Sequence, residues 1–412
     1  MEIQEPINWR KLDRVERGKL IFQNHNIKKV PQGWRVHSQT NPCIDYIVKF
    51  KRDNPICTCP DCEIAKKKCK HIYAVEYYIK QEIDEEGKLS QTKGIKITYG
   101  QQWKAYDTAQ TNEKLLFMKL LRDLCDTMEQ PSYIFGRPKL PYSDMVFSSA
   151  MKVYTTFSLR RFMSDMKIAK EMNLTDEVPC FASVGHFLQK EELTPILKDL
   201  IKISATPLSS IETDFAVDSS GFSTYRFARY FDYKYGRETK YRIWLKAHLI
   251  SGVKTNIVTG AEITEGRVND SPQLSSLVVE TSKRFNMQEV SCDRAYSSRE
   301  NLSLIKEVGA MPFIPFKKNA SAKIKGSLIW KKMYYYFMYK HEEFLQHYHK
   351  RSNAETVFYM IKTKFKDNLR SKSKTAQINE LLCKVLCHNI CCVIQEISEL
   401  GIKGEFVVEE KK

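Results

Sequence analysis

The order of predicted strands and helices after residue 211 constrains the fold more than any other feature of the sequence. Three consecutive segments rich in β-branched and other apolar residues predict three strands in succession. Helices then alternate with short strands, and Gly309 ends one of these helices. Strands are expected at 214–220, 242–251, 256–264, 289–293 and 311–316, and helices at 271–285 and 297–309. This order predicts a mixed sheet covered by helices.

Two acidic residues stand at the ends of predicted strands. Asp218 follows the apolar part of the first strand, and Asp293 ends the short buried strand. Central strands run through the core, so solvation explains acids at their ends poorly. If these strands are neighbours and Glu355 lies on a helix packed across them, three carboxylates converge. Such a cluster of oxygen ligands suits Mg²⁺ or Mn²⁺.

Glu355 itself lies in one of the most basic parts of the chain and has two interpretations. On a helix, Tyr348, Arg351, Glu355 and Lys362 would form one stripe. However, Ser352 and Glu355 also form a capping-box pattern, in which the glutamate only satisfies a backbone donor. The local sequence does not separate the two interpretations. The strand-end acids favour the metal site.

Four potential metal ligands are grouped in the N-terminal region. They form two pairs, each split by one residue: Cys57 and Cys59, then Cys69 and His71. Zn²⁺ favours four sulfur and nitrogen ligands in a closed tetrahedral site. Strands expected at 33–38 and 45–50 precede this group and a helix expected at 71–83 follows it, which predicts a small ββα zinc module. Cys62 is an extra thiol that could replace Cys57.

Charge and composition narrow the class of partner. Lys and Arg total 66 against 49 acidic residues, a formal charge of +17. Such an excess favours a polyanion, with nucleic acid preferred to an anionic membrane surface. No apolar run reaches the roughly 18 residues of a membrane span, and the polar N-terminus lacks a signal peptide. We therefore expect a cytoplasmic protein without a disulfide framework.

The remaining segments carry less specific signals. Residues 96–205 read as mostly helical and basic, so they either contact a DNA backbone or form a plain packing region. Residues 317–332 are expected to form a mobile basic loop. Asp270 is interpreted as a helix N-cap with Ser271. A buried packing face on the last helix is expected for Cys383, Cys387, Cys391 and Cys392.

Three segments together resemble a known family. They are "AVDSSGF" around Asp218, "SCDRAYSS" around Asp293, and the stripe Tyr348-x2-Arg351-x3-Glu355-x6-Lys362. These segments resemble the two aspartate segments and the Tyr-Arg-Glu-Lys signature of DDE transposases from prokaryotic insertion sequences. The resemblance covers roughly 211–395. The cysteine and histidine pattern resembles the SWIM zinc finger, and the run Lys66 to Lys68 suits nucleic-acid binding.

The resemblance implies an α/β chain, α+β overall, with an RNase H-like mixed sheet flanked by helices. It divides the sequence into a SWIM-type module at 20–95, a helical DNA-binding region at 96–205 and a DDE catalytic domain at 206–400. Some relatives carry a long β-rich insertion before the glutamate. Only 61 residues separate Asp293 from Glu355, which leaves little room for one.

The implied activity is metal-dependent cleavage at transposon ends, followed by transfer of the 3′-hydroxyl into target DNA. Asp218, Asp293 and Glu355 would hold Mg²⁺ or Mn²⁺, and Zn²⁺ would occupy the N-terminal module. Contacts with transposon-end phosphates would come from Tyr348, Arg351 and Lys362. The implied partners are double-stranded DNA, as inverted-repeat ends and target, and a second copy in a homodimer on DNA. The implied location is the nucleoid of a prokaryote, with no role at a membrane.

Two other functions stay open at this point. One is a catalytically silent DNA-binding protein derived from a transposase. The other is a metal-dependent nuclease that cuts without joining.

Overall fold

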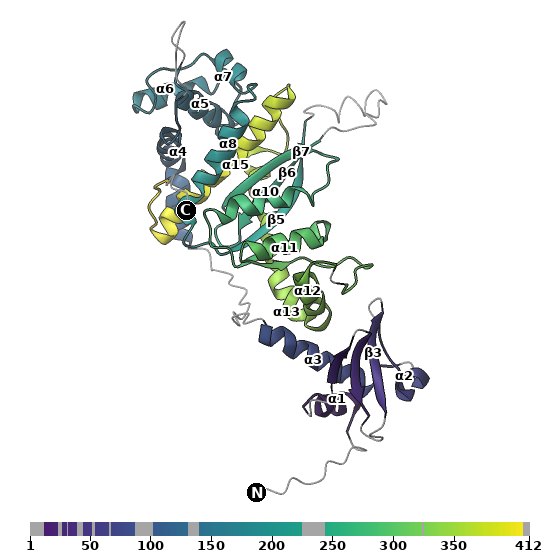
Figure 1. Cartoon of the computed structure of the whole chain (residues 1–412). Helices are drawn as coiled ribbons and strands as arrows, with labels where there is room; N and C mark the ends of the chain where they lie inside the picture. Colours follow the sequence, from purple (N-terminus) through teal and green to yellow (C-terminus); the bar gives the residue numbers. More distant parts are fainter. Residues whose placement is uncertain are drawn as a thin grey trace, which may run out of the picture. The chain divides into compact units, whose positions relative to one another are not determined.

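The computed structural model forms two compact units, and Figure 1 labels many of their helices and strands. The first unit combines Met1–Lys96 with Pro315–His347, and the second combines Ile97–Ile314 with Tyr348–Lys412. Both the helical region and the strand-rich region of the sequence contribute to the second unit. The structure describes residues 12–23, 27–30, 32–38, 44–51, 54–65, 67–86, 102–130, 140–224, 244–323 and 325–406. Lys66 of the lysine run lies outside these residues.

The second unit is built on a five-stranded mixed sheet. Its strands, in chain order, are β5 (Asp214–Ser223), β6 (Trp244–Gly252), β7 (Val258–Glu265), β8 (Glu289–Cys292) and β9 (Met311–Phe313). In space the order is β7-β6-β5-β8-β9. Neighbours among β7, β6 and β5 are antiparallel, while β8 is parallel to β5 and β9 is parallel to β8. This confirms the expected RNase H-like mixed sheet flanked by helices.

The helices of the second unit pack around this sheet and extend beyond it. They are α4 (Trp103–Asp126), α5 (Tyr142–Tyr154), α6 (Met163–Glu171), α7 (Phe181–Phe187), α8 (Leu193–Ser204), α10 (Gln273–Ser282), α11 (Arg299–Glu307), α14 (Ser352–Phe365) and α15 (Lys374–Leu400). Helix α11 begins as expected, since the Ser298 hydroxyl accepts a hydrogen bond from the Asn301 N–H at 3.1 Å. It ends before Gly309, whose φ is +93°.

Helix α15 forms the core of the second unit and packs against α4, α5 and α8. Within the described residues it is long and apolar enough to cross a membrane, but 78% of its most apolar window is buried inside the protein. Its apolar surface is therefore used in packing. Cys383, Cys387 and Cys392 are buried in that packing and Cys391 is partly buried, as the sequence predicted.

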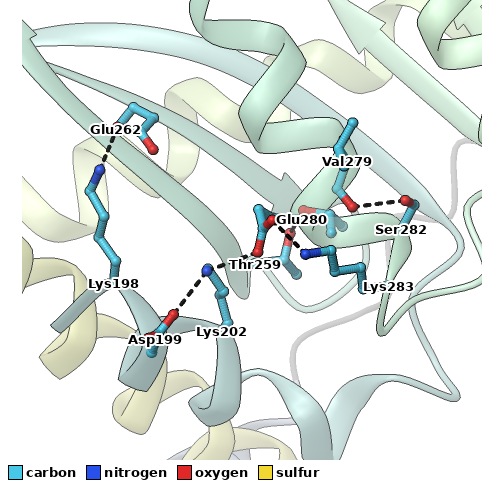
Figure 2. Close-up of polar contacts among 10 residues, drawn as sticks. Lys198, Asp199, Lys202, Thr259, Glu262, Val279, Glu280, Ser282 and Lys283 are labelled. Atoms are coloured by element: carbon cyan, nitrogen blue, oxygen red, sulfur yellow. Dashed lines mark hydrogen bonds and ion pairs between the residues drawn. The ribbon is translucent and has the colours of Figure 1, made fainter. Parts of the chain in front are cut away.

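A row of side-chain ion pairs joins α8 to the edge strand β7 and to α10 (Figure 2). Lys198 Nζ donates to Glu262 Oε2 at 2.6 Å. Lys202 Nζ donates to Glu280 Oε2 at 2.9 Å, and Lys283 Nζ donates to the other Glu280 oxygen at 2.8 Å. These ion pairs therefore hold α8 against both the edge strand and α10.

We predict that Glu280 contributes to stability only above acidic pH. Hydrogen bonds from Lys283 and Lys202 lower the pKa of Glu280 to about 2. Its contribution should therefore be complete above its unfolded pKa near 4.5 and be lost as the pH falls toward 2. Glu280→Gln should lower the Tm by about 1–3 °C at pH 7 and change it less at pH 3. Thermal denaturation at both pH values tests this, and an equal change at both would contradict it.

The first unit contains a four-stranded antiparallel sheet in the order β1-β2-β3-β4. The strands are β1 (Ile27–Val30), β2 (Gly33–His37), β3 (Asp45–Lys51) and β4 (Asn54–Cys57), and the helices are α1 (Arg14–Gln23), α2 (Pro60–Ala65), α3 (Lys70–Glu86), α12 (Leu328–Tyr339) and α13 (His341–Tyr348). The expected hairpin forms its centre, but β1 and β4 make the module larger than the predicted ββα unit. Gly33 is required at the start of β2, because a Cβ there would lie 2.2 Å from the Val48 carbonyl oxygen.

The segment between β9 and the helix of Glu355 corrects one expectation. The loop predicted over 317–332 ends early, because α12 begins at Leu328 with the Ser327 hydroxyl as its N-cap. Basic and small residues suggested a loop, but Trp330 is only 5% exposed and its ring packs against Phe316. Tyr335 of α12 also meets Trp34 of β2 edge to face at 6.0 Å. A helical segment that packs within the first unit therefore occupies the interval between Asp293 and Glu355.

Candidate active site and metal centre

The register of β5 and β8 brings two acids together. These parallel strands pair from Asp214 with Glu289 to Val217 with Cys292. Asp218 and Asp293 occupy the next position on each chain, on the same face, and parallel neighbours lie about 4.8 Å apart. The sequence suggested that Asp218 ends its strand, and this expectation is wrong. Strand β5 continues to Ser223 because β6 pairs with its full length, so the strand that ends beside Asp218 is β8.

Arg351 connects Glu355 to this pair. It lies in a single 3₁₀ turn, His349–Arg351, directly before α14. Its guanidinium donates from Nη1 to Asp218 Oδ2 at 2.7 Å and from Nη2 to Glu355 Oε1 at 2.5 Å. Glu355 is therefore held beside Asp218 by a shared cation.

The capping-box interpretation of Glu355 is wrong. Helix α14 has no side-chain N-cap, and the Ser352 hydroxyl donates instead to the His349 carbonyl oxygen at 2.9 Å. The Glu355 side chain faces Arg351 and is 61% exposed. A glutamate without a capping role, open to solvent beside other carboxylates, is free to accept a further cation.

The electrostatics of Asp218 reflect this convergence. Burial raises the pKa of Asp218, and the negative charges of Asp293 and Glu355 raise it further. The Ser219 N–H, 2.9 Å from Oδ1, and the Arg351 guanidinium act in the opposite direction. Arg351 is thus hydrogen-bonded to two of the three carboxylates, and Asp293 lies near enough for its charge to act on Asp218. The remaining negative charge and the oxygen-only donor set fit a divalent cation such as Mg²⁺ or Mn²⁺.

Tyr348 and Lys362 extend the site along the same side of β5. Burial raises the pKa of Tyr348, and the positive charge of the neighbouring Arg351 offsets part of that rise. Lys362 Nζ donates to the Ser220 hydroxyl at 2.6 Å and lies 5.0 Å from the centre of the Phe222 ring. Ser220 is two residues beyond Asp218 and so faces the same way. The structure therefore brings the whole predicted stripe to one face of the sheet.

Lys350 is a residue of this region that sequence reasoning missed. Its Nζ donates to Asp214 Oδ2 and to Glu289 Oε2, each at 2.7 Å. These two acids are register partners at the starts of β5 and β8, so they would repel each other without a cation. Burial would lower the pKa of Lys350, but the hydrogen bonds with both acids raise it above its usual value. Lys350 thus fixes the turn that carries Arg351 to the sheet.

Asp270 does not cap α10, contrary to the sequence-based expectation. Its carboxylate accepts hydrogen bonds from Lys246 Nζ at 2.7 Å and from the Ser219 hydroxyl at 3.2 Å. Helix α10 follows Pro272 and has no side-chain cap. Ser219 points to the face of β5 opposite to Asp218. Asp270 therefore lies apart from the three other acids, and Lys246 neutralises its charge.

The cysteine and histidine residues of the first unit form a second candidate metal centre. One ligand atom from each of Cys57, Cys59, Cys69 and His71 lies within 4.8 Å of the others, and all four residues are buried. His71 Nδ1 is 3.8 Å from the sulfurs of both Cys57 and Cys69. A tetrahedral zinc site with ordinary bond lengths has edges of about 3.5–3.8 Å, so the group fits Zn²⁺. Cys62 lies outside the group, which leaves Cys57 as the fourth ligand.

Comparison with known proteins agrees with the geometry of the second unit. Residues 209–390 match the model of a family described as a transposase DDE domain. This interval contains the three acids and the stripe of Tyr348, Arg351 and Lys362. No solved structure matches the chain. The match supports a DDE transposase, a class whose catalytic domains use divalent metals and act on DNA.

We predict that the purified chain carries about one equivalent of zinc, because the four buried ligand atoms form a closed site. Cys57→Ser should lower the bound zinc to well below half, whereas Cys62→Ser should leave it unchanged. Inductively coupled plasma mass spectrometry on both variants measures this. Loss of zinc in Cys62→Ser with retention in Cys57→Ser would contradict the assigned ligands.

We also predict that Lys350→Met destabilises the second unit. The change removes the cation that Asp214 and Glu289 share at their partly buried positions, which should lower the free energy of unfolding by about 1–3 kcal/mol. Adding Asp214→Asn and Glu289→Gln removes the repulsion and should restore most of that loss. Urea denaturation at pH 7 measures each variant. A triple variant less stable than Lys350→Met would argue against the charge account.

Proposed function

We propose that the chain is a DNA transposase that cuts at transposon ends and joins the freed 3′-hydroxyl to target DNA. This proposal is carried by Arg351, which is hydrogen-bonded to both Asp218 and Glu355, and by Asp293, whose charge acts on Asp218 where β8 ends. The match of this same region to transposase DDE domains supports it. The formal charge of +17 favours the polyanionic substrate that such an activity needs.

Asp218, Asp293 and Glu355 would hold Mg²⁺ or Mn²⁺. When bound, a pair of these ions supplies Lewis-acid activation of an attacking oxygen and stabilisation of a leaving oxygen at a phosphodiester. In the first reaction, water attacks the phosphorus atom at the transposon end. The bond to the 3′-oxygen breaks, and that oxygen leaves as a hydroxyl after taking up a proton. In the second, this hydroxyl loses its proton and attacks a phosphorus atom of the target DNA. The bond from that phosphorus to the target 3′-oxygen breaks, and this oxygen leaves as a hydroxyl after taking up a proton, so no covalent protein intermediate forms.

The basic stripe would position the DNA for both reactions. Arg351 bridges two of the acids, and its charge becomes available for a phosphate once cations neutralise those acids. A guanidinium can bind a phosphate through two parallel hydrogen bonds. Lys362 would bind a neighbouring phosphate by charge, and Tyr348 by hydrogen bonding or stacking.

Residues 20–95, the N-terminal part of the first unit, would act as a SWIM-type zinc module that helps to hold DNA. Its buried four-ligand group supports the zinc assignment, and Lys67 and Lys68 lie beside it in the sequence. The three regions at 20–95, 96–205 and 206–400 would then serve as zinc module, helical DNA-binding region and catalytic domain. Pairing of two transposon ends would require a homodimer on DNA, in the nucleoid of a prokaryote.

We predict that Glu355→Gln abolishes cutting without abolishing DNA binding. Loss of one metal-binding carboxylate should lower the cleavage rate about 10²-fold or more, while the Kd for DNA changes by less than about threefold. Glu300→Gln in α11 is the matched control and should cut at the wild-type rate. The assay follows 3′-end cutting and joining of a duplex that carries the gene's own flanks, in Mg²⁺, Mn²⁺ or chelator.

Two outcomes of this assay would contradict the proposal. Binding without cutting by the wild type would indicate a catalytically silent DNA-binding protein. Metal-dependent cutting without joining would indicate a nuclease.

A further inference from the structure

A basic cavity lies in the second unit, apart from the three acids. It has a volume of about 930 Å³ and is walled by the segment that follows α5, by α7 and by the turn between α14 and α15. Four of its lining residues are Lys152, Arg161, Arg370 and Lys372. Among the described residues that line it, none is acidic. Its charge therefore favours an anionic ligand.

The four basic side chains divide into structural and available groups. Lys152 is only 6% exposed, and its charge acts on the buried carboxylate of Glu380. Arg370 donates from its guanidinium to the carbonyl oxygens of Thr156 and Phe157. Arg161 and Lys372, by contrast, are exposed and form no ion pair within the part of the chain that the structure describes. These two cations are available to a ligand.

The rim of the cavity is held in an unfavourable backbone conformation. Thr156 has a φ of +54°, which a β-branched residue rarely adopts. The hydrogen bonds from Arg370 fix this segment, and the next residue, Phe157, is 47% exposed where it lines the cavity. An exposed aromatic ring beside unpaired cations is the combination that proteins use to hold nucleic-acid strands.

The position of the cavity relative to the acids follows from β5. At the end of this strand, the Ser223 N–H donates to the Asp367 carbonyl oxygen at 3.0 Å, and the Leu369 N–H donates to Ser223 at 2.8 Å. Arg370 of the cavity is the next residue. Ser223 is five residues beyond Asp218, which corresponds to about 17 Å along a strand. Since DNA rises about 3.4 Å per base pair, Ser223 lies about five nucleotide steps from Asp218, and the cavity begins at this end of the strand.

We propose that this cavity binds the sugar-phosphate backbone of the DNA strand that reaches the three acids, about five nucleotides from the cut. Arg161 and Lys372 bind its phosphates, and Phe157 packs against the adjoining sugar or base. Lys362, which contacts β5 between the acids and the cavity, marks the intervening path. The inference rests on the proposed function, because the acids define where the cut lies.

The first test measures binding alone, so that it does not depend on cleavage. The full chain is titrated with a fluorescein-labelled duplex of the gene's flank, without added divalent ion, at several salt concentrations. Arg161→Ala/Lys372→Ala should weaken binding about tenfold or more at low salt and reduce the slope of log K against log salt by about two. The matched control, Lys306→Ala/Lys403→Ala, should keep the wild-type slope. Equal slopes for the two double variants would overturn the proposal.

The second test locates the contact. Single neutral methylphosphonates are placed at successive positions of the duplex. Wild-type binding should fall when the substitution lies about five nucleotides from the cut, and Arg161→Ala/Lys372→Ala should be insensitive to that same substitution. Equal sensitivity of both proteins at every position would contradict the assignment.

A third arm distinguishes a DNA strand from a free nucleotide. Any dAMP binding that calorimetric titration detects in the wild type should persist in Arg161→Ala/Lys372→Ala. Tight dAMP binding that is lost in the variant, together with unchanged DNA binding, would overturn the assignment to DNA. An inactive wild type in the cleavage assay would remove the proposed function but leave these binding results interpretable.

Discussion

The parallel pairing of β5 with β8 is the constraint on which the candidate active site depends. It ends at Val217 and Cys292, and so Asp218 and Asp293 are the next residues on the two chains, where β8 ends. The same pairing sets Asp214 against Glu289 at the other end, where Lys350 neutralises both. The turn that contains Lys350 also carries Arg351 and leads into the helix of Glu355. One strand pair thus positions all three acids.

The site is strongly charged but incompletely neutralised. Arg351 donates hydrogen bonds to Asp218 and Glu355. Burial, followed by the charges of Asp293 and Glu355, nevertheless raises the pKa of Asp218. Asp270 lies on the opposite side of β5 and is paired with Lys246, so it does not add to the cluster. Side chains alternate between the two faces of β5. Asp270 therefore forms its ion pair with Lys246 on one face, while Asp218 lies on the other face with the candidate metal ligands.

The sequence predicted the strands and candidate metal ligands that depend on local sequence patterns. Strand pattern and charge identified Asp218 and Asp293, and ligand spacing identified the group from Cys57 to His71. Sequence reasoning missed Lys350, because the partners of that residue are more than sixty positions away and depend on the strand register. It assigned Asp270 as a helix cap from its position before Ser271. The assignment was wrong because tertiary contacts with Lys246 and Ser219 set the direction of this side chain. The helix at Leu328 was missed because its burial depends on aromatic contacts within the first unit.

The most direct measurement of the central claim is iron-directed cleavage of the protein backbone. Fe²⁺ replaces Mg²⁺ at oxygen sites, and with peroxide it cuts the chain near the bound ion. Convergence of the three acids predicts cuts near residues 218, 293 and 355 that excess Mg²⁺ suppresses. Any cut near Cys57 to His71 should resist Mg²⁺, because sulfur ligands do not favour that ion. Magnesium-sensitive cuts near only one of the three acids, or near none, would contradict the account.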